Sequence, residues 1–132
     1  AHTLHGIFSA EFPNMLVAHV VQGGFGLNFV HYLSELSEHL AWIIATCEAE
    51  GITSIEATTE AEDAWLAALW KAGEGFGRYS ATCTPSYGNS EGARNEAAAR
   101  NVVHPGSLMH YVAHLERWRA SGDMPGTRVT RG

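Results

Sequence analysis

The stretch that decides the fold is FPNMLVAHVVQGGFGLNF, residues 12–29 of the 132-residue chain. Residues 15–21 are nearly continuous in apolar side chains, and the run is too short for a good helix. Such a run is typical of a strand that is covered on both faces, as in a parallel sheet. The segment QGGFG, residues 22–26, then breaks the run. We therefore expect a buried strand, a glycine turn and a helix, although the residues before 12 offer no neighbouring strand.

A long amphipathic helix is expected directly after the glycine turn. Asn28 is a good N-cap residue, and Gly51 stands where the end of a helix favours glycine. Apolar residues recur at helical spacing, while serine and glutamate occupy the opposite face. The apolar positions are Phe29, Leu33, Leu36, Leu40, Ile43 and Ile44.

A short strand and a second helix are expected next. Residues 52–57 are rich in β-branched side chains, and Thr59 with Glu62 matches a capping box at the start of a helix. Glycine at position 73 and beyond ends that helix. Its expected buried stripe is Trp65, Leu69 and Ala72.

The last third of the chain predicts a long loop, a third helix and a short final strand. Residues 80–106 are rich in Pro, Asn, Ser and Gly, which is typical of a functional loop or one packed on another part of the protein. The helix begins after the N-cap Ser107, ends at Ser121–Gly122 and is followed by a strand at 128–130. Its apolar stripe is Leu108, Tyr111, Val112, Leu115 and Trp118. The expected fold class is therefore α+β and mostly helical.

The composition argues against several classes of function. The chain has 45% apolar and only 17% charged residues, which suggests that other protein covers much of its surface. Its net charge of −6, without a Lys/Arg run, argues against binding to nucleic acid or to anionic membranes. There is no 18-residue apolar stretch and no signal-peptide pattern. Cys47 and Cys83 are in no motif, so we expect two free thiols in a cytoplasmic protein rather than a disulfide.

The glycine turn fits part of a cofactor site but no complete nucleotide-binding motif. A strand, a glycine turn and a helix N-terminus present N–H groups and a positive dipole to an anion. However, Phe29 stands where G-x-G-x-x-G needs its third glycine, and no Lys-Ser/Thr of a P-loop follows. Two interpretations stay open: the glycines only shape a tight turn, or a polar edge of a ligand rests on the helix end.

Other chemistry is poorly supported by the sequence. His110 and His114 are four residues apart with His104 nearby, and His31, Glu35 and His39 share a helix face, but H-E-x-x-H is missing. We therefore expect no metal site. Ser86 and Ser90 lack the G-x-S-x-G elbow of a nucleophilic serine, so we expect no catalytic residue here.

Four segments, taken in order, resemble one enzyme family. FPNMLVAHVVQGGFGLNFVHYLSELSEHLAWII resembles the C-terminal region of class B flavoprotein monooxygenases of the Baeyer–Villiger type, which has a G-F-P-N-L-F strand, a turn and a long helix. EATTEAEDAWLAAL looks like the next helix of the family. CTPSYGNSEG is similar to a C-T-P-G-Y-Y-N-N-E-G segment of one branch, and GSLMHYVAHLERWRASGDMPG resembles that branch's closing helix.

The resemblance implies that the chain is a C-terminal fragment, 1–132, of an FAD- and NADPH-dependent monooxygenase. Residues 12–50 would be a strand-turn-helix unit of an α/β FAD-binding fold, and residues 52–132 a helical C-terminal region. Such an enzyme inserts one oxygen atom of O2 into a ketone or heteroatom substrate through a peroxyflavin. The two G-x-G-x-x-G turns of the family, for FAD and NADPH, are not in this chain, so the isolated fragment is expected to be inactive and to bind neither cofactor.

The resemblance also implies a cofactor-facing group. In related flavoproteins the helix N-terminus points at the pyrimidine edge of the flavin, where negative charge collects on reduction. By position, this implies Gln22, Gly23, Gly24 and Asn28 as the flavin-facing residues. The chain departs from the family pattern at Glu11, His19, Val21, Ser86, Gly88 and Ser90. The last three put a substrate-side role of that loop in doubt.

Two alternatives remain at this stage: a stand-alone helical interaction module without catalysis, and a small metal-binding protein. The expected partners of the fragment are the remainder of the monooxygenase chain and a small-molecule substrate. An unpaired strand at 15–21 would be an exposed edge. We therefore expect it to pair with a second copy, giving a homodimer, to pair with one of the chain's own short strands, or to rearrange.

Overall fold

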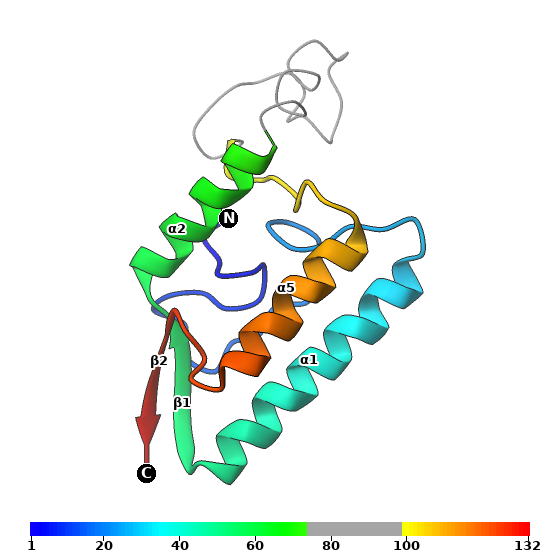
Figure 1. Ribbon diagram of the computed structural model, residues 1–132. Coiled ribbons are helices and arrows are strands. Elements are labelled where there is room, and N and C mark those ends of the chain that lie inside the picture. Colours follow the sequence, from blue (N-terminus) through cyan, green and yellow to red (C-terminus); the bar gives the residue numbers. More distant parts are fainter. Residues whose placement is uncertain (74–98) are drawn as a thin grey trace.

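The computed structural model describes residues 1–73 and 99–132. In this part of the chain three helices surround an irregular N-terminal segment, and a two-stranded sheet extends from one end (Figure 1). The elements are α1 (Phe29–Ala49), β1 (Ile52–Ala57), α2 (Thr59–Ala72), α5 (Leu108–Ser121) and β2 (Thr127–Arg131). The fold is thus of mixed α and β type, as the sequence predicts.

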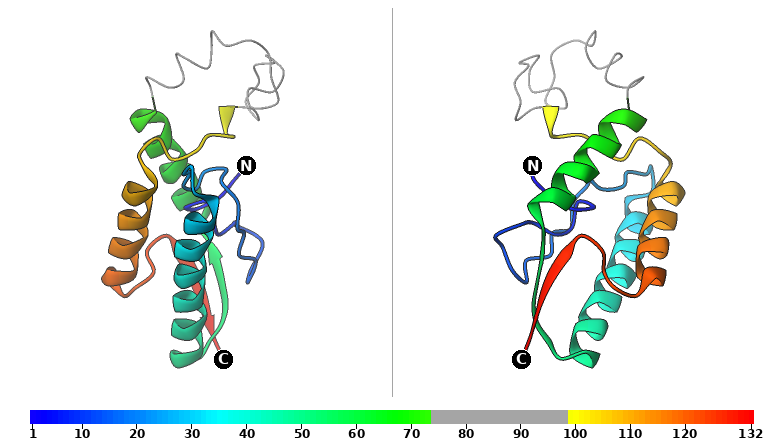
Figure 2. Two further views of the ribbon diagram at one scale, coloured as in Figure 1. Left: turned by 90° about the vertical axis from the view of Figure 1, so that its right-hand side faces the viewer. Right: turned by 60° about the vertical axis from the view of Figure 1, so that its left-hand side comes forward.

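The expected caps of α1 and α5 are confirmed. The Asn28 side chain accepts a hydrogen bond from His31 N, and the Ser107 side chain accepts one from His110 N. At the other ends, Gly51 and Gly122 have φ angles of +65° and +80°, which glycine adopts without strain. Helices α1 and α5 lie side by side in the views of Figures 1 and 2.

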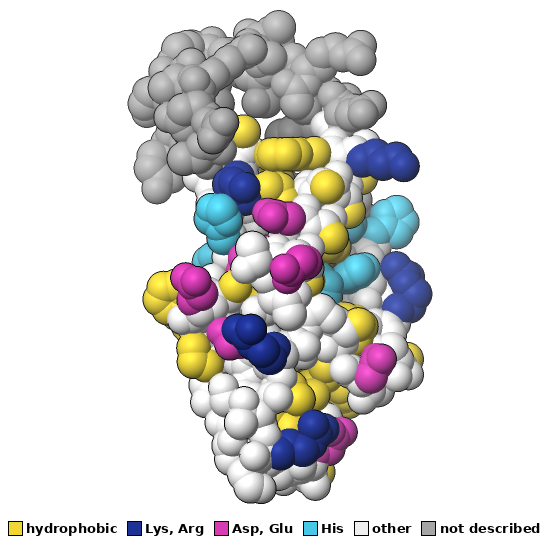
Figure 3. All heavy atoms as spheres, turned by 90° about the vertical axis from the view of Figure 1, so that its left-hand side faces the viewer, with side chains coloured by type: hydrophobic (Ala, Val, Ile, Leu, Met, Phe, Trp, Pro, Cys, Tyr) yellow, Lys and Arg dark blue, Asp and Glu magenta, His cyan; other side chains and the backbone are white. Residues whose placement is uncertain are grey.

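Strands β1 and β2 pair antiparallel although about seventy residues separate them in the chain. Arg128 bonds Glu56 across the pair at 2.7 Å, and Arg131 bonds Glu50 at 2.8 Å. Figure 3 shows oppositely charged side chains close together on this face, below a region richer in hydrophobic and histidine side chains. The two short strands predicted at 52–57 and 128–130 are present.

The buried strand predicted at residues 15–21 is wrong. Leu16 makes one isolated bridge to Phe8, and Val17 N donates to Ile7 O at 2.8 Å, but the segment is otherwise bends and turns. Met15 and Ala18 are exposed and the other residues of the run are only half-buried. A regular strand needs a partner along its length, and here only a short N-terminal turn lies beside it. The segment therefore pairs with neither β1 nor β2.

The start of α2 also differs from the expected capping box. The N-cap is Thr58, not Thr59, and its hydroxyl accepts from Ala61 N at 3.2 Å. Glu62 is buried and its carboxylate accepts from Ala10 N at 2.7 Å instead of capping its own helix. In a capping box this carboxylate would instead accept from the backbone N–H at the start of its own helix. Trp65 and Leu69 of the expected stripe are buried, whereas Ala72 is exposed.

The N-terminal segment contributes to the core, although its first residues read as polar and loop-like. Leu4, Ile7 and Phe8 are at most 5% exposed and pack between the helices. All five residues of the apolar stripe predicted for α5 are buried. Most of the predicted loop 80–106 lies outside the described residues. No helix in the described part is both long and apolar enough to cross a membrane.

Candidate cofactor-facing turn

The turn between residues 22 and 28 lies where the N-terminal segment, α2 and α5 meet. Gln22 is 1% exposed, and its side-chain amide is fully engaged within the chain. Oε1 accepts from Thr3 N at 3.1 Å and from Thr3 Oγ1 at 2.6 Å. Nε2 donates to the carbonyl oxygens of Ala1 at 2.9 Å and Arg100 at 2.8 Å. The Gln22 amide therefore serves the interior of the fold.

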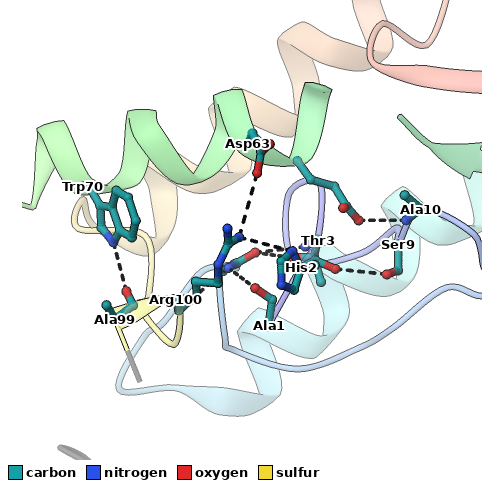
Figure 4. Close-up of polar contacts among 11 residues, drawn as sticks. Ala1, His2, Thr3, Ser9, Ala10, Asp63, Trp70, Ala99 and Arg100 are labelled. Atoms are coloured by element: carbon teal, nitrogen blue, oxygen red, sulfur yellow. Dashed lines mark hydrogen bonds and ion pairs between the residues drawn. The ribbon is translucent and has the colours of Figure 1, made fainter. Parts of the chain in front are cut away.

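The segments joined by Gln22 are held together by further polar contacts at the chain surface (Figure 4). The Ala1 ammonium donates to Asn101 Oδ1 at 2.9 Å, and Arg100 lies near His2 at 3.2 Å and Asp63 at 3.8 Å. Trp70 Nε1 donates to Ala99 O at 2.9 Å. These contacts tie the chain on both sides of position 100 to the N-terminus and to α2.

The backbone of the turn is equally constrained. Gln22 has φ +58°, in the left-handed region that a residue with a side chain seldom adopts. Trp65 Nε1 donates to Gln22 O at 2.8 Å, and His104 N donates to Gly23 O at 2.8 Å. A Cβ at Gly24 would lie 2.4 Å from Tyr111 Cδ1, so only glycine fits against that ring. The four residues expected to face the flavin thus divide: Gln22, Gly23 and Gly24 are buried, and Asn28 is exposed.

The second half of the turn and the first turn of α1 are open. The exposed fractions are 54% for Phe25, 103% for Leu27, 51% for Phe29 and 77% for Val30. Within the described ranges, the backbone N–H groups of residues 24–27 donate to no other residue. The first turn of α1 contains no acidic residue, so its N–H groups and helix dipole face no carboxylate of their own helix.

A cluster of aromatic and imidazole rings lies beneath the turn. The His5 ring centroid is 4.9 Å from that of Trp65, 4.6 Å from that of His114 and 5.8 Å from that of Trp118. Burial, with the nearby His114 and His39, lowers the pKa of His5 to about 3. His5 Nδ1 and His114 Nε2 are buried and have no hydrogen-bond partner among the described residues. Burying a polar nitrogen in this way costs stability.

The other buried histidines behave in the same way. Burial, with Arg119 beside the ring at 3.0 Å, lowers the pKa of His39 to about 4. Burial lowers the pKa of His104 and of His114 as well. Burial also raises the pKa of Tyr111, whose hydroxyl donates to His5 O at 2.7 Å.

The described residues contain no group of three or more metal-ligating side chains. Of the three residues that share one face of α1, His31 and Glu35 are in contact at 3.1 Å, whereas His39 is buried against Arg119. Cys47 is a free thiol, and Cys83 lies outside the described residues.

Sequence reasoning missed two residues that fix the turn, Thr3 and Trp65. Trp65 reads only as part of an apolar helix stripe, but a buried indole must place its N–H on an acceptor, and that requirement is a usable signal. Nothing in the sequence near Thr3 indicates that it pairs with a glutamine nineteen residues away.

The chain is similar in sequence to known monooxygenases. No family profile matches the chain. It is 38% identical over 117 residues to a Baeyer–Villiger monooxygenase of Streptomyces coelicolor, which covers 89% of this chain and 19% of that protein. The FAD-binding monooxygenase hmp7 of Hypomyces subiculosus is 32% identical over 128 residues, covering 97% of this chain and 21% of that protein.

The fold of the chain is also similar to that of solved monooxygenase structures. The polycyclic ketone monooxygenase of Thermothelomyces thermophila superposes with a TM-score of 0.83 at 34% identity, over 99% of this chain and 21% of that one. The chain corresponds to one region of the Baeyer–Villiger monooxygenases. The cyclohexanone monooxygenase of Rhodococcus sp. Phi1, at 22% identity and TM-score 0.78, shares the fold of this region.

The similarity covers only part of each relative. The chain spans about a fifth of the length of the curated relatives that it matches. Because similarity to these enzymes extends over nearly all of the chain, the interpretation as a stand-alone interaction module is not favoured.

Proposed function

We propose that the chain is the C-terminal portion of an FAD- and NADPH-dependent monooxygenase that inserts one oxygen atom of O2 into a ketone or heteroatom substrate. One observation supports this most strongly: both sequence and fold match such enzymes over almost the entire chain. Among the relatives, hmp7 is named as FAD-binding, and a cyclohexanone monooxygenase structure is titled as bound to NADP+. The flavin, when bound, supplies the redox chemistry, which no side chain of this region needs to provide.

The role we propose for this region is to support one edge of the flavin. The open half of the turn fits that role, because the N–H groups of residues 24–27 have no partner among the described residues and α1 begins there. Asn28 caps α1 and is exposed, so it can contact a cofactor edge without unfolding its surroundings. Gln22, Gly23 and Gly24 would contribute from beneath, by holding the backbone of the turn.

The remainder of the monooxygenase is the partner we propose for the apolar face at the start of α1. Phe25, Leu27, Phe29, Val30 and Leu33 are all more than a third exposed. A face of this kind marks an interface, and relatives about five times as long supply enough protein to cover it. In a preparation of residues 1–132 alone, a second copy is the alternative cover, and light scattering would show the resulting homodimer.

The test uses the full-length enzyme that contains this region. Purified protein should contain FAD and should oxidise NADPH in an O2-dependent way when a ketone is added. Failure to bind FAD would contradict the proposed function.

Asn28→Ala tests the contribution of the turn, with Ser107→Ala as its matched control. Both variants remove the N-cap of one helix and should cost about 1 kcal/mol of stability. Only Asn28→Ala should weaken the retention of FAD. Equal FAD retention in the two variants would contradict the role proposed for Asn28.

A further inference from the structure

Gln22 has a conformation that its own side chain disfavours. A left-handed φ of +58° in a residue other than Gly, Asn or Asp costs on the order of 1 kcal/mol or more. Such a residue persists only when its surroundings determine its conformation. Here the surroundings are named: four hydrogen bonds hold the side-chain amide, and the backbone N–H and C=O are bonded to Val102 O and Trp65 Nε1.

Two consecutive peptide units of the turn are fixed in this way. In the unit that joins residues 22 and 23, the carbonyl accepts from Trp65 Nε1 at 2.8 Å and the N–H donates to Val20 O at 3.1 Å. In the next unit, Gly23 O accepts from His104 N at 2.8 Å. Because a trans peptide is planar with its C=O and N–H pointing in opposite directions, the bond to His104 turns the Gly24 N–H away from His104. The orientation of the following, open half of the turn is set by these bonds.

Trp65 can hold its bond because its ring cannot turn away. It is 7% exposed, with His5 and His114 ring centroids at 4.9 and 4.8 Å and the His104 ring stacked at 6.0 Å. Thr3 is likewise buried, at 5% exposed, and bonds Gln22 Oε1 through both its N–H and its hydroxyl. The two donors reach Gln22 from different segments, α2 and the N-terminus.

We propose that Gln22 is a positioning residue, locked by Trp65 and Thr3, and that it presents residues 24–28 to the flavin without contacting the flavin itself. This inference rests on the proposed function and adds how the turn obtains its shape. It predicts that removing a distant donor, the indole N–H on α2, changes the flavin environment.

Trp65→Phe in the full-length enzyme is the test, and Trp118→Phe is its control. Each variant removes one indole N–H that donates to a backbone carbonyl at 2.8 Å, Gln22 O for Trp65 and Pro125 O for Trp118. Both tryptophans are nearly buried, at 7% and 6% exposed, so the two variants should lose similar thermal stability. The readouts are the dissociation constant of FAD and the visible circular dichroism of the bound flavin.

We expect Trp65→Phe to raise the dissociation constant about fivefold, as for one lost hydrogen bond, and to change the flavin circular dichroism. Trp118→Phe should leave both within twofold of the wild type. If both variants behave alike while the wild type binds FAD, the inference is wrong and the proposed function stands. If the wild type binds no FAD, the proposed function is wrong.

Thr3→Val provides a milder second variant if Trp65→Phe does not fold. Its matched control is Thr127→Val, because both remove a hydroxyl that donates within the chain, at 2.6 Å to Gln22 Oε1 and at 2.7 Å to Met124 O. Weaker FAD binding in Thr3→Val alone supports the inference. Unchanged FAD binding in a folded Thr3→Val overturns it.

Discussion

Residues 22–24 and residues 25–33 are adjacent in the chain but differ in almost every physical property. In the first segment all three residues are buried, and the carbonyls of Gln22 and Gly23 accept from Trp65 on α2 and from His104, which precedes α5. The Gln22 side chain bonds the N-terminus and Arg100. In the second, five large apolar side chains are exposed and the N–H groups at 25–27 have no partner among the described residues. One segment is enclosed by this chain, whereas the other is the face for which we propose a covering surface in the full-length enzyme.

The difference separates two kinds of glycine turn that look alike in sequence. A turn that binds phosphate by itself needs small residues throughout, so that the ligand reaches the backbone. Here glycine is required at 24 for packing against Tyr111, and the open half contains large apolar residues. The buried half of the turn faces inward, as the supporting role we propose for it requires. Four experiments test this division, from the largest expected effect to the smallest.

Tyr111→Ala should have the largest effect on the stability of the chain. The ring is 1% exposed beneath Gly24 and its hydroxyl bonds His5 O, so its loss leaves a cavity and an unpaired carbonyl. We expect a loss of about 3–5 kcal/mol in the free energy of unfolding, measured by chemical denaturation. Met109→Ala, on the same helix but 55% exposed, should change it by less than about 0.5 kcal/mol. Equal losses would show that the buried half is not better packed than its surroundings.

Acid should lower the stability of the folded chain, because His5 and His39 are buried in their neutral form. His5 and His39 have pKa values lowered to about 3 and 4, so they are neutral in the folded chain and take up protons on unfolding below the usual value of 6.5. Stability is therefore fully present above pH 6.5 and is lost as the pH falls toward 4. The two groups together should cost about 2–4 kcal/mol between pH 6.5 and pH 5.

The measurement is urea unfolding at several pH values. His5→Leu should flatten the dependence of the unfolding free energy on pH, because the protonation of His5 no longer contributes. An unchanged slope in a folded His5→Leu would mean that His5 is not part of the acid response.

Gly24→Ala should cost about 1–3 kcal/mol, because the new methyl group would overlap the Tyr111 ring. Gly26→Ala is the comparison in the open half. There the nearest atom is the terminal Cδ2 of Leu108, at 3.1 Å, which can move aside, so the loss should be clearly smaller. Thermal unfolding of both variants measures the difference. A larger loss for Gly26→Ala would reverse the assignment of buried and open halves.

Leu27→Ser combined with Val30→Ser should have the smallest effect on the stability of the chain. These side chains are 103% and 77% exposed, so we expect a change within about 0.5 kcal/mol. In the full-length enzyme the same change should reduce stability, because the proposed interface would lose apolar burial. Loss of stability in residues 1–132 alone would mean that this face already packs within the chain.

The sequence predicted the elements whose signals are local. Helix α1 with its Asn28 cap, helix α5 with its Ser107 cap and both short strands follow from periodicity and capping chemistry within a few residues. The similarity to Baeyer–Villiger monooxygenases was readable for the same reason, since it lies in short segments in a fixed order.

Failures occurred where a distant partner decided the outcome. The apolar run at 15–21 indicates burial but does not specify a hydrogen-bond partner, and it formed no strand beside a short N-terminal turn. Glu62 was predicted to be part of a capping box, but its carboxylate accepts a hydrogen bond from Ala10 N. The partners of Gln22 were likewise not predictable, because Thr3, Ala1 and Arg100, which bond its amide, are distant in the chain.

By itself the sequence determined α1 and α5 with their ends, because these depend on interactions within one or two turns of the chain. Only the tertiary structure decided which half of the glycine turn is closed and which is open. That outcome depends on hydrogen-bond partners from α2, from residues 100–104 and from the N-terminus, which are up to about eighty residues away. Buried polar groups need hydrogen-bond partners. Which residues become these partners depends on the fold, and a local sequence pattern does not indicate them.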